Sequence, residues 1–172
     1  VYVDQNNDGV INDDDRRIYH SKDPKVTMSF SSTFNWKNWD LGIAMHANIG
    51  NYVYADAMSD HAVVDDCWKN GKLNNLIQTD YYFNGTVNPA VGIMKSDYWL
   101  RNASFLRCDN ITLGHTWPYL LDNKMRLRLY GAVQNPFVIT KYKGLDPEVA
   151  SGIDRDVYPR ATTFTIGVVA SF

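Results

Sequence analysis

An alternating run of oxygen-bearing side chains near the start of the chain has the types and spacing of a metal site. A glycine, Gly9, follows the third of these side chains, where a chain that wraps around an ion must turn sharply. EF-hand loops bind Ca²⁺ with the same order of groups: three spaced side-chain oxygens, a glycine, a backbone carbonyl and a distal carboxylate. We expect Ca²⁺ ligands at Asp4, Asn6, Asp8, the carbonyl of Val10, and Asp15.

The last ligand position of this run departs from the EF-hand pattern. Asp15 stands where EF-hands place glutamate, and its shorter side chain reaches the ion less easily with both oxygens. No long helical pattern flanks the run on either side. The alternative interpretation is therefore a solvated acidic turn, and a bound ion would serve to rigidify the loop rather than to catalyse a reaction.

The remaining polar residues do not form a catalytic or nucleic-acid-binding constellation. The four histidines are scattered, without the spacing of a metal pair, a nucleophile elbow or a triad. The net charge of −2 gives no basic surface for nucleic acid. Cys67 and Cys108 lie in different kinds of segment, which favours two separate thiols over a disulfide. We expect a protein that is not an enzyme.

Alternating hydrophobicity defines the elements that must position these residues. In 26–36 the apolar side chains share one face and Ser, Thr and Asn share the other, and the pattern resumes in 39–50 after Lys37-Asn38. Two such runs joined by two residues predict a β-hairpin. Three further strands are predicted at 103–117, at 124–135 with a continuation towards 142, and at 162–172.

Long irregular segments separate the pairs of strands. Residues 51–101 and 143–160 are rich in Asp, Asn, Gly and Pro, with a short helix expected within 52–58, whereas 118–123 is a short turn. Strands of 9–11 residues with one apolar face are typical of outer-membrane β-barrels, which have short periplasmic turns and long extracellular loops. We therefore expect an all-β, antiparallel transmembrane β-barrel segment, with residues 1–24 as an extracellular acidic loop and 25–172 as strands and loops.

Five strands cannot close a barrel, because an unpaired strand edge is not tolerated in lipid and the smallest barrels have about eight strands. We expect the chain to be the C-terminal segment of a larger barrel, with its C-terminus on the periplasmic side. The chain begins at Val1 without a signal peptide, so we expect the precursor to be longer. A mean hydropathy of −0.35, with no apolar run of 18 residues, argues against a transmembrane helix.

The predicted strands and loops assign places to several side chains. Arg126, Arg128 and Tyr130 share the polar face and are expected to line the lumen, where contact with a plug is favoured over contact with substrate. His46 is expected in the lumen wall and His115 on the lipid-facing side at the interface. Aromatic rings in the first long loop are the candidates for contact with cargo or a partner protein, since rings dominate such surfaces; they are Trp68, Tyr81, Tyr82, Phe83, Tyr98 and Trp99.

Several motifs, in order, resemble one known family. They are the run from Asp4 to Arg16, Asp23-Pro24-Lys25, Leu100 to Arg107, Asn110 to Gly114, Gln134 to Phe137, Lys143 to Val149, and Tyr158-Pro159-Arg160. Together they resemble the C-terminal part of the SusC/RagA-type TonB-dependent outer-membrane transporters of Bacteroidetes. The resemblance implies a barrel of about 22 strands with an N-terminal plug, a TonB-interacting segment, a SusD-like surface lipoprotein as partner, and a glycan or peptide as cargo.

The function expected from this resemblance is active import across the outer membrane of a Gram-negative bacterium. Two alternatives remain open from the residues alone. One is a TonB-dependent receptor for metal chelates of the siderophore type. The other is a soluble, Ca²⁺-dependent β-sandwich that binds a ligand.

Overall fold

The structure is a computed structural model, and it describes residues 3–60, 68–69, 72–73, 96–120, 122, 124–155 and 157–172. The chain divides into two compact units. The first, which we call the sheet unit, comprises Pro24–Gly50, Ser104–Lys141 and Tyr158–Phe172. The second, which we call the loop unit, comprises Val1–Asp23, Asn51–Ala103 and Tyr142–Val157.

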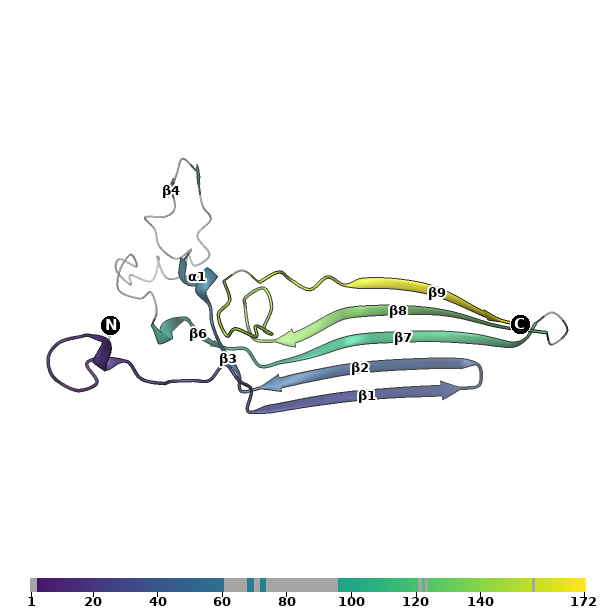
Figure 1. Cartoon of the computed structure of the whole chain (residues 1–172), viewed down its shortest axis with the longest axis horizontal. Coiled ribbons are helices and arrows are strands. Elements are labelled where there is room, and N and C mark those ends of the chain that lie inside the picture. The colour runs from purple at the N-terminus through teal and green to yellow at the C-terminus, as the bar shows by residue number, and fades with distance from the viewer. Residues whose placement is uncertain are drawn as a thin grey trace. The chain divides into compact units, whose positions relative to one another are not determined.

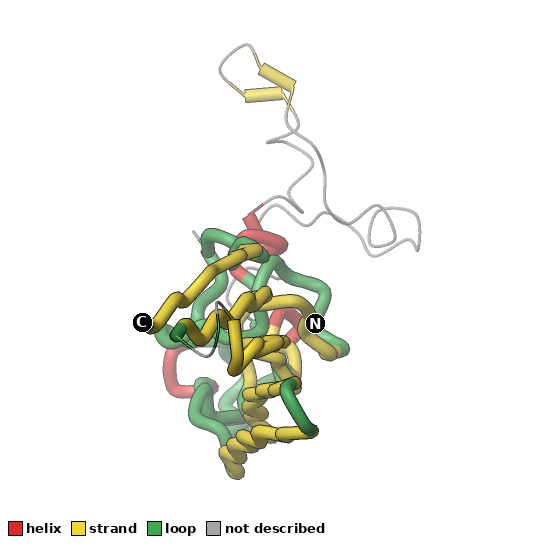
Figure 2. The backbone as a smooth tube through the Cα atoms, turned by 90° about the vertical axis from the view of Figure 1, so that its right-hand side faces the viewer, coloured by secondary structure: helices red, strands yellow, loops and turns green. Residues whose placement is uncertain are grey.

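The sheet unit is one antiparallel sheet of five strands in the order β1-β2-β7-β8-β9 (Figure 1). Figure 2 shows the same strands in yellow, seen from their ends. The five strands and their antiparallel arrangement agree with the prediction, because alternating hydrophobicity is sustained along each of them. Their bounds are β1 Val26–Trp36, β2 Trp39–Ile49, β7 Phe105–Leu120, β8 Met125–Thr140 and β9 Thr163–Ser171.

The register joins the apolar faces of all five strands into one surface. Phe34 pairs with Leu41, Leu41 with Leu113, Leu113 with Gly131, and Gly131 with Ile166. The large side chains on this face are exposed in the chain, with Phe34 at 64% and Ile166 at 83% of their full surface. Exposed apolar side chains in contiguous rows, rather than singly, mark a surface made to be covered. Lipid covers such a face in a transmembrane barrel.

Connections at the two ends of the sheet differ in length. Lys37-Asn38 and the short segment between β7 and β8 connect strands at one end, where Phe172 also lies (Figure 1); we call this the turn end. At the other end, 50–104 and 141–162 connect β2 to β7 and β8 to β9. The predicted alternation of short and long connections is confirmed. The sandwich alternative is wrong, since the five long strands lie in one sheet.

Two details of the strands differ from the sequence prediction. The strand β7 runs through Pro118 to Leu120, and its register with β8 shifts between Trp117 and Leu120, so the proline lies in an irregularity that needs no N–H there. The polar sequence from Arg107 to Asp109 predicts a segment that protrudes from the sheet. In the structure Arg107 and Cys108 are paired with both neighbouring strands, and Arg107 is 4% exposed; of the three, only Asp109 is left out of the ladders.

A β-bulge crosses the centre of the sheet. Asp109 has no partner in the ladders on either side, since Cys108 and Asn110 pair with adjacent residues of β2. On β8 the matching irregularity falls at Asn135, whose φ is 49°. The carbonyl of Asn135 accepts from Thr162 Oγ1 at 2.9 Å, which fastens the start of the β9 region to β8. Bulges redirect side chains, and this one aims Asp109 at β2.

The loop unit has a small core of its own. Val53, Ala103 and Tyr142 are buried against one another with Val149 at their side. The strand β3 (Tyr52–Tyr54) pairs with β6 (Leu100–Asn102) and is bridged on its other side by Ile153. Backbone bonds from Tyr54 N to the Gly152 carbonyl and from Asp154 N to the Tyr54 carbonyl, at 2.8 and 2.9 Å, form that bridge. Three separate segments of the chain therefore build one core.

The other elements of the loop unit are short. The helix expected within 52–58 begins later, as α1 (Asp56–Asp60), because Tyr52–Tyr54 is drawn into the pairing with β6. The 3-10 turns are η1 (Asp13–Asp15) and η3 (Asp97–Trp99), and β4 (Trp68–Lys69) pairs with β5 (Lys72–Leu73). Among the described residues, no helix has the length and apolar character needed to cross a bilayer.

Candidate functional site

An ion pair crosses the polar face of the sheet at the turn end. Arg128 on β8 donates from Nε to Asp40 Oδ1 at 3.1 Å and from Nη2 to Oδ2 at 2.5 Å. Asp40 lies on β2, so the pair reaches across β7, where a Cβ on Gly114 would lie only 2.5 Å from Asp40 Oδ1. Glycine at this position therefore makes room for the pair. Both side chains are half-buried, and the two parallel bonds fix the guanidinium plane.

Tyr130 extends this arrangement to β9. The Arg128 guanidinium carbon lies 4.9 Å from the centre of the Tyr130 ring, within cation–π range. The ring covers Gly167, where a Cβ would fall within 2.4 Å of ring atoms. We call Asp40, Arg128 and Tyr130 the cross-strand chain. Arg126, two residues nearer the turn end along β8, is exposed. Arg126, Arg128 and Tyr130 thus share the polar face as the alternation implies, and Asp40 is the partner that sequence reasoning missed.

A second polar pair lies at the bulge. His46 Nδ1 lies 2.8 Å from Asp109 Oδ2, and the His46 ring meets the edge of Phe105 with 5.4 Å between ring centres. Arg107 lies over the same Phe105 ring at 5.5 Å. The bulge therefore holds His46 in place on the polar face of the sheet, which is the face expected to line the lumen.

The acidic run forms a loop whose carboxylates bind its own backbone. Asp4 Oδ1 accepts from Asn7 N at 2.7 Å and Asp4 Oδ2 from Gly9 N at 2.8 Å, while Asp8 Oδ1 accepts from Val10 N. Gly9 has φ +82°, a conformation that favours glycine. Asp15 closes the loop by accepting from the backbone N–H groups of Asn12 and Gln5, and these bonds lower the pKa of its carboxyl.

The donor set of this loop is chemically suited to Ca²⁺, since every expected ligand presents oxygen. The arrangement seen here is held by internal hydrogen bonds. Within the described part of the chain, no three His, Cys, Asp or Glu side chains converge as they would around a metal ion. The sequence pattern and the glycine turn fit a Ca²⁺ ion. In this structure the carboxylates bind backbone N–H groups of the loop and do not converge on one point.

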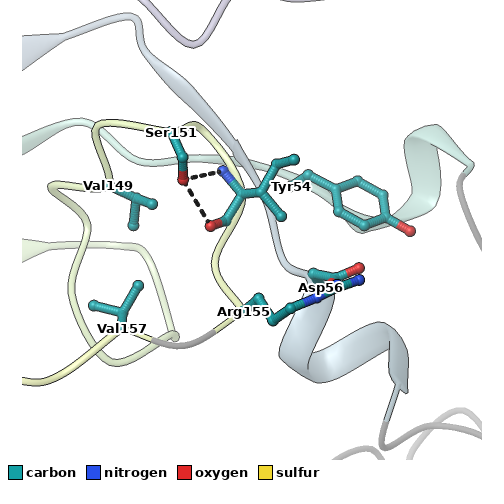
Figure 3. Close-up of a pocket in the computed structure, with 7 residues that line it drawn as sticks. Tyr54, Asp56, Val149, Ser151, Arg155 and Val157 are labelled. Atoms are coloured by element: carbon teal, nitrogen blue, oxygen red, sulfur yellow. Dashed lines mark hydrogen bonds and ion pairs between the residues drawn. The ribbon is translucent and has the colours of Figure 1, made fainter.

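A pocket of about 590 Å³ opens in the loop unit beside β3 (Figure 3). Arg155 donates from Nε to Asp56 Oδ2 on one side of it, close to Tyr54. Val149 and Val157 form an aliphatic wall, and Ser151 bonds the backbone of Ile153. Aliphatic walls with a few placed polar groups are typical of small-molecule sites, although this pocket is wide open. Of its residues, only Val149, at the end of the motif that begins at Lys143, was singled out from the sequence.

The motif from Lys143 to Val149 has a packing role in the loop unit. The Tyr142 hydroxyl donates to Asp154 Oδ2, and a Cβ on Gly144 would lie 2.2 Å from the Tyr142 ring. Burial, together with the neighbouring Asp154 carboxylate, raises the pKa of the Tyr142 hydroxyl well above its ordinary value. Asp146 is buried as well and accepts from Glu148 N at 2.9 Å. Gly144 and Asp146 of this motif therefore support the packing around Tyr142, whereas Leu145 is 65% exposed.

The structure describes only some of the aromatic residues expected to contact cargo or a partner. Tyr81, Tyr82 and Phe83 lie outside the described residues, and Trp68 begins β4 without a described side chain. Tyr98 is 42% exposed, whereas Trp99 is 2% exposed and packs edge-on against it. Tyr98 therefore carries the exposed ring of that pair.

Of the two cysteines, the structure describes only one. Cys67 lies outside the described residues, whereas Cys108 on β7 is a buried, free thiol. Its Sγ faces the Ala44 carbonyl at 3.7 Å, beside the bulge.

Comparison with known proteins covers the entire chain. It is 40% identical to the TonB-dependent receptor SusC of Bacteroides thetaiotaomicron, over 100% of this chain and 17% of that receptor. It is 26% identical to the TonB-dependent receptor P3 of Formosa agariphila, over 100% of this chain and 19% of that protein. The chain thus spans about a fifth of the length of these relatives. No family model matches it. The relatives are receptors, not enzymes.

Solved structures share the fold. The RagAB peptide importer in its open-open state matches with a TM-score of 0.67 and 23% identity, over 91% of this chain and 18% of that one. A second structure of the RagAB transporter gives a TM-score of 0.64 over 90% of the chain. The open sheet is therefore a segment of an outer-membrane β-barrel. Sequence and fold together show that this chain belongs to the SusC/RagA type of TonB-dependent receptor and corresponds to its C-terminal part.

Proposed function

We propose that the protein to which this chain belongs imports a glycan or a peptide through the outer membrane, driven by TonB and capped by a SusD-like lipoprotein. The observation that carries this proposal is the 40% identity to SusC along the entire chain. The likeness in fold to the RagAB peptide importer supports it. The sheet contributes a lipid-facing side and, opposite to it, a wall of polar side chains suited to a water-filled lumen.

The alternating connections support one orientation in the membrane. Short turns face the periplasm and long loops face the outside in bacterial barrels. We therefore place the turn end and Phe172 on the periplasmic side, and the loop unit outside. Tyr98, with its exposed ring, and the loop residues Trp68, Tyr81, Tyr82, Phe83 and Trp99 then belong to the region that meets cargo or the lipoprotein.

The contacts of the cross-strand chain support different roles for Arg128 and Arg126 on the lumen wall. Arg128 is held by Asp40 and Tyr130, which stiffens the wall, whereas the exposed Arg126 offers its charge to a plug. Replacing Arg126 with alanine should weaken plug retention more than Arg128→Ala weakens it. Plug retention in the two variants is measured by crosslinking the plug to the barrel in the intact receptor. The yield of crosslinked plug is expressed relative to the amount of folded barrel.

Intact-mass measurement and peptide mapping of the native complex, extracted in detergent, test the assignment. We expect a polypeptide several times the length of this chain together with a SusD-like lipoprotein. Uptake of labelled oligosaccharides and labelled peptides by cells with and without the receptor then identifies the cargo. Uptake of ferric chelates alone, without a lipoprotein in the complex, would replace the proposal with a metal-chelate receptor.

We also propose that the acidic loop binds Ca²⁺ through Asp4, Asn6, Asp8, the Val10 carbonyl and Asp15. The ion would supply rigidity to the loop and no chemistry to transport. Terbium luminescence of the intact receptor should saturate with added Tb³⁺ and be displaced by Ca²⁺. Asp8→Asn should weaken this binding, whereas Asp23→Asn, outside the loop, should not. Equal luminescence from both variants would contradict the site.

A further inference from the structure

The apolar face of the sheet finishes, at the turn end, in a cluster of aromatic rings. Trp36 pairs with Trp39, and Trp39 pairs with His115, so the three side chains form one row across β1, β2 and β7. The His115 ring lies between two indoles, with ring centres 4.5 Å from Trp39 and 4.4 Å from Trp117. All three tryptophans are exposed, at 58%, 46% and 39%.

Two nitrogen-bearing side chains accompany these rings. Lys37, in the turn, places its Nζ 5.0 Å from the centre of the Trp36 ring. His115 Nδ1 is buried and has no hydrogen-bond partner among the residues that the structure describes. The nearby acidic residue Asp40 points to the opposite face and is taken by Arg128. The cluster thus joins cationic and aromatic groups, and the adjacent carboxylate is engaged elsewhere.

The position of the cluster along the strand corresponds to a bilayer boundary. The strand β1 has 11 residues, which span about 36 Å at roughly 3.3 Å each, and tilt reduces this length to about the thickness of the hydrocarbon core. Phe34, Leu41 and Leu113 form the next row and are apolar. Indole rings prefer the level of the headgroups, and a nearby lysine ammonium reaches the same level.

We propose that Trp36, Lys37, Trp39, His115 and Trp117 form a binding site for one membrane phospholipid. Its phosphate is held by the Lys37 ammonium and by His115 through Nε2, the ring nitrogen opposite the buried Nδ1, and its acyl chains lie along the row of Phe34, Leu41 and Leu113. Continuity of the cluster with the lipid-facing surface favours a lipid over free phosphate, since free phosphate would gain nothing from the apolar rows. The site rests on the membrane-spanning fold and is independent of what the receptor imports.

Lipid retention by the intact receptor tests the site. The receptor is reconstituted in nanodiscs of phosphatidylethanolamine and phosphatidylglycerol, transferred to detergent, and its retained phospholipid is counted by native mass spectrometry. The double variant Lys37→Ala/His115→Phe keeps an aromatic ring at 115 while removing both nitrogen groups. We expect it to lose about one retained phospholipid per receptor. Lys143→Ala, a charge change in the loop unit, is the matched control and should retain the wild-type number.

A conservative variant and a competitor give the remaining outcomes. Lys37→Arg should retain the phospholipid, because the cation is kept. Inorganic phosphate should not displace the phospholipid. Displacement would show that the site recognises the anion alone, and would overturn the proposal. Equal retention by the double variant and the wild type, both with intact barrels by their resistance to protease, would overturn the proposal. Cargo uptake should be unchanged in the double variant, so this test and the import test fail independently.

Discussion

The two units of this chain differ in where their large apolar side chains lie. In the loop unit, Val53 and Trp99 are enclosed at 1% and 2% exposure, as in a protein that folds in water. In the sheet unit, the large apolar residues of β1 and β9 are exposed, and polar side chains such as Asp40 and Arg128 contact one another on the other face. The comparison shows that one part of the chain is suited to water and the other to a lipid bilayer. Whether protein covers an apolar residue therefore depends on the unit to which the residue belongs, more than on its hydrophobicity.

The largest effect should come from a charge placed on the lipid-facing side. Ile166→Arg should destabilise the intact barrel in bilayers by about 2–4 kcal/mol, because a cation near the middle of the membrane is poorly solvated. Thr165→Arg, the neighbouring residue on the polar face, is the matched control. Urea unfolding of the reconstituted receptor measures both. Equal losses would show that the two faces do not meet different solvents.

A smaller effect should follow from adding one methyl group to the loop unit. Gly144→Ala places a Cβ against the Tyr142 ring, and overpacking of this kind costs about 1–3 kcal/mol. Hydrogen exchange should accelerate in residues 142–155 and stay unchanged in β8. Gly131→Ala in the sheet is the control, since its nearest neighbour would be the Thr165 carbonyl at 4.0 Å. Acceleration in the sheet as well would contradict two separately packed units.

The cross-strand chain should show a coupling of about 1 kcal/mol between Asp40 and Arg128. Removal of either partner leaves a half-buried charge unpaired, so Asp40→Asn and Arg128→Gln should each destabilise the barrel. The double variant should lose less than the sum of the two. Additive losses in a double-mutant cycle would mean that the pair is merely adjacent and does not brace the strands.

The smallest effect is expected in the acidic loop, on lowering the pH. The pKa of Asp15 is lowered by its backbone hydrogen bonds, so its stabilising contribution is present above the ordinary pKa of 3.8 and is lost as pH falls through the lower folded value. Hydrogen exchange at the Gln5 and Asn12 amides should rise below about pH 4. In Asp15→Asn this pH dependence should disappear. An unchanged dependence would assign it to another carboxylate.

Local patterning was sufficient to predict the sheet but not its side-chain connections. Alternation over 26–36 and the two-residue turn at Lys37 predicted β1 and β2 because each strand carries its own face pattern. Pro118 was read as a turn, although the irregular register at the end of β7 accommodates it. The bond between Asp40 and Arg128 joins residues 88 positions apart, and only the register of three strands reveals it.

The loop unit was harder to predict for the same reason. Tyr52–Tyr54 is too short for alternation to be read, and it becomes a strand only through pairing with Leu100–Asn102. The residues of the pocket, among them Asp56 and Arg155, come from segments about a hundred positions apart. The acidic loop, by contrast, is local: its hydrogen bonds lie within twelve consecutive residues, and its spacing was visible in the sequence.

The interleaving of the two units along the chain gives them contacts of very different sequence separation. The core of the loop unit needs Val53, Ala103 and Tyr142, and the last of these follows β7 and β8 in the sequence. Val53 pairs with Arg101, which lies almost fifty residues further along the chain. Contacts between distant residues form slowly because a long loop must close first. We expect the hairpin of β1 and β2 to form early and the loop unit to form later, because the contacts of its core join residues far apart in the sequence.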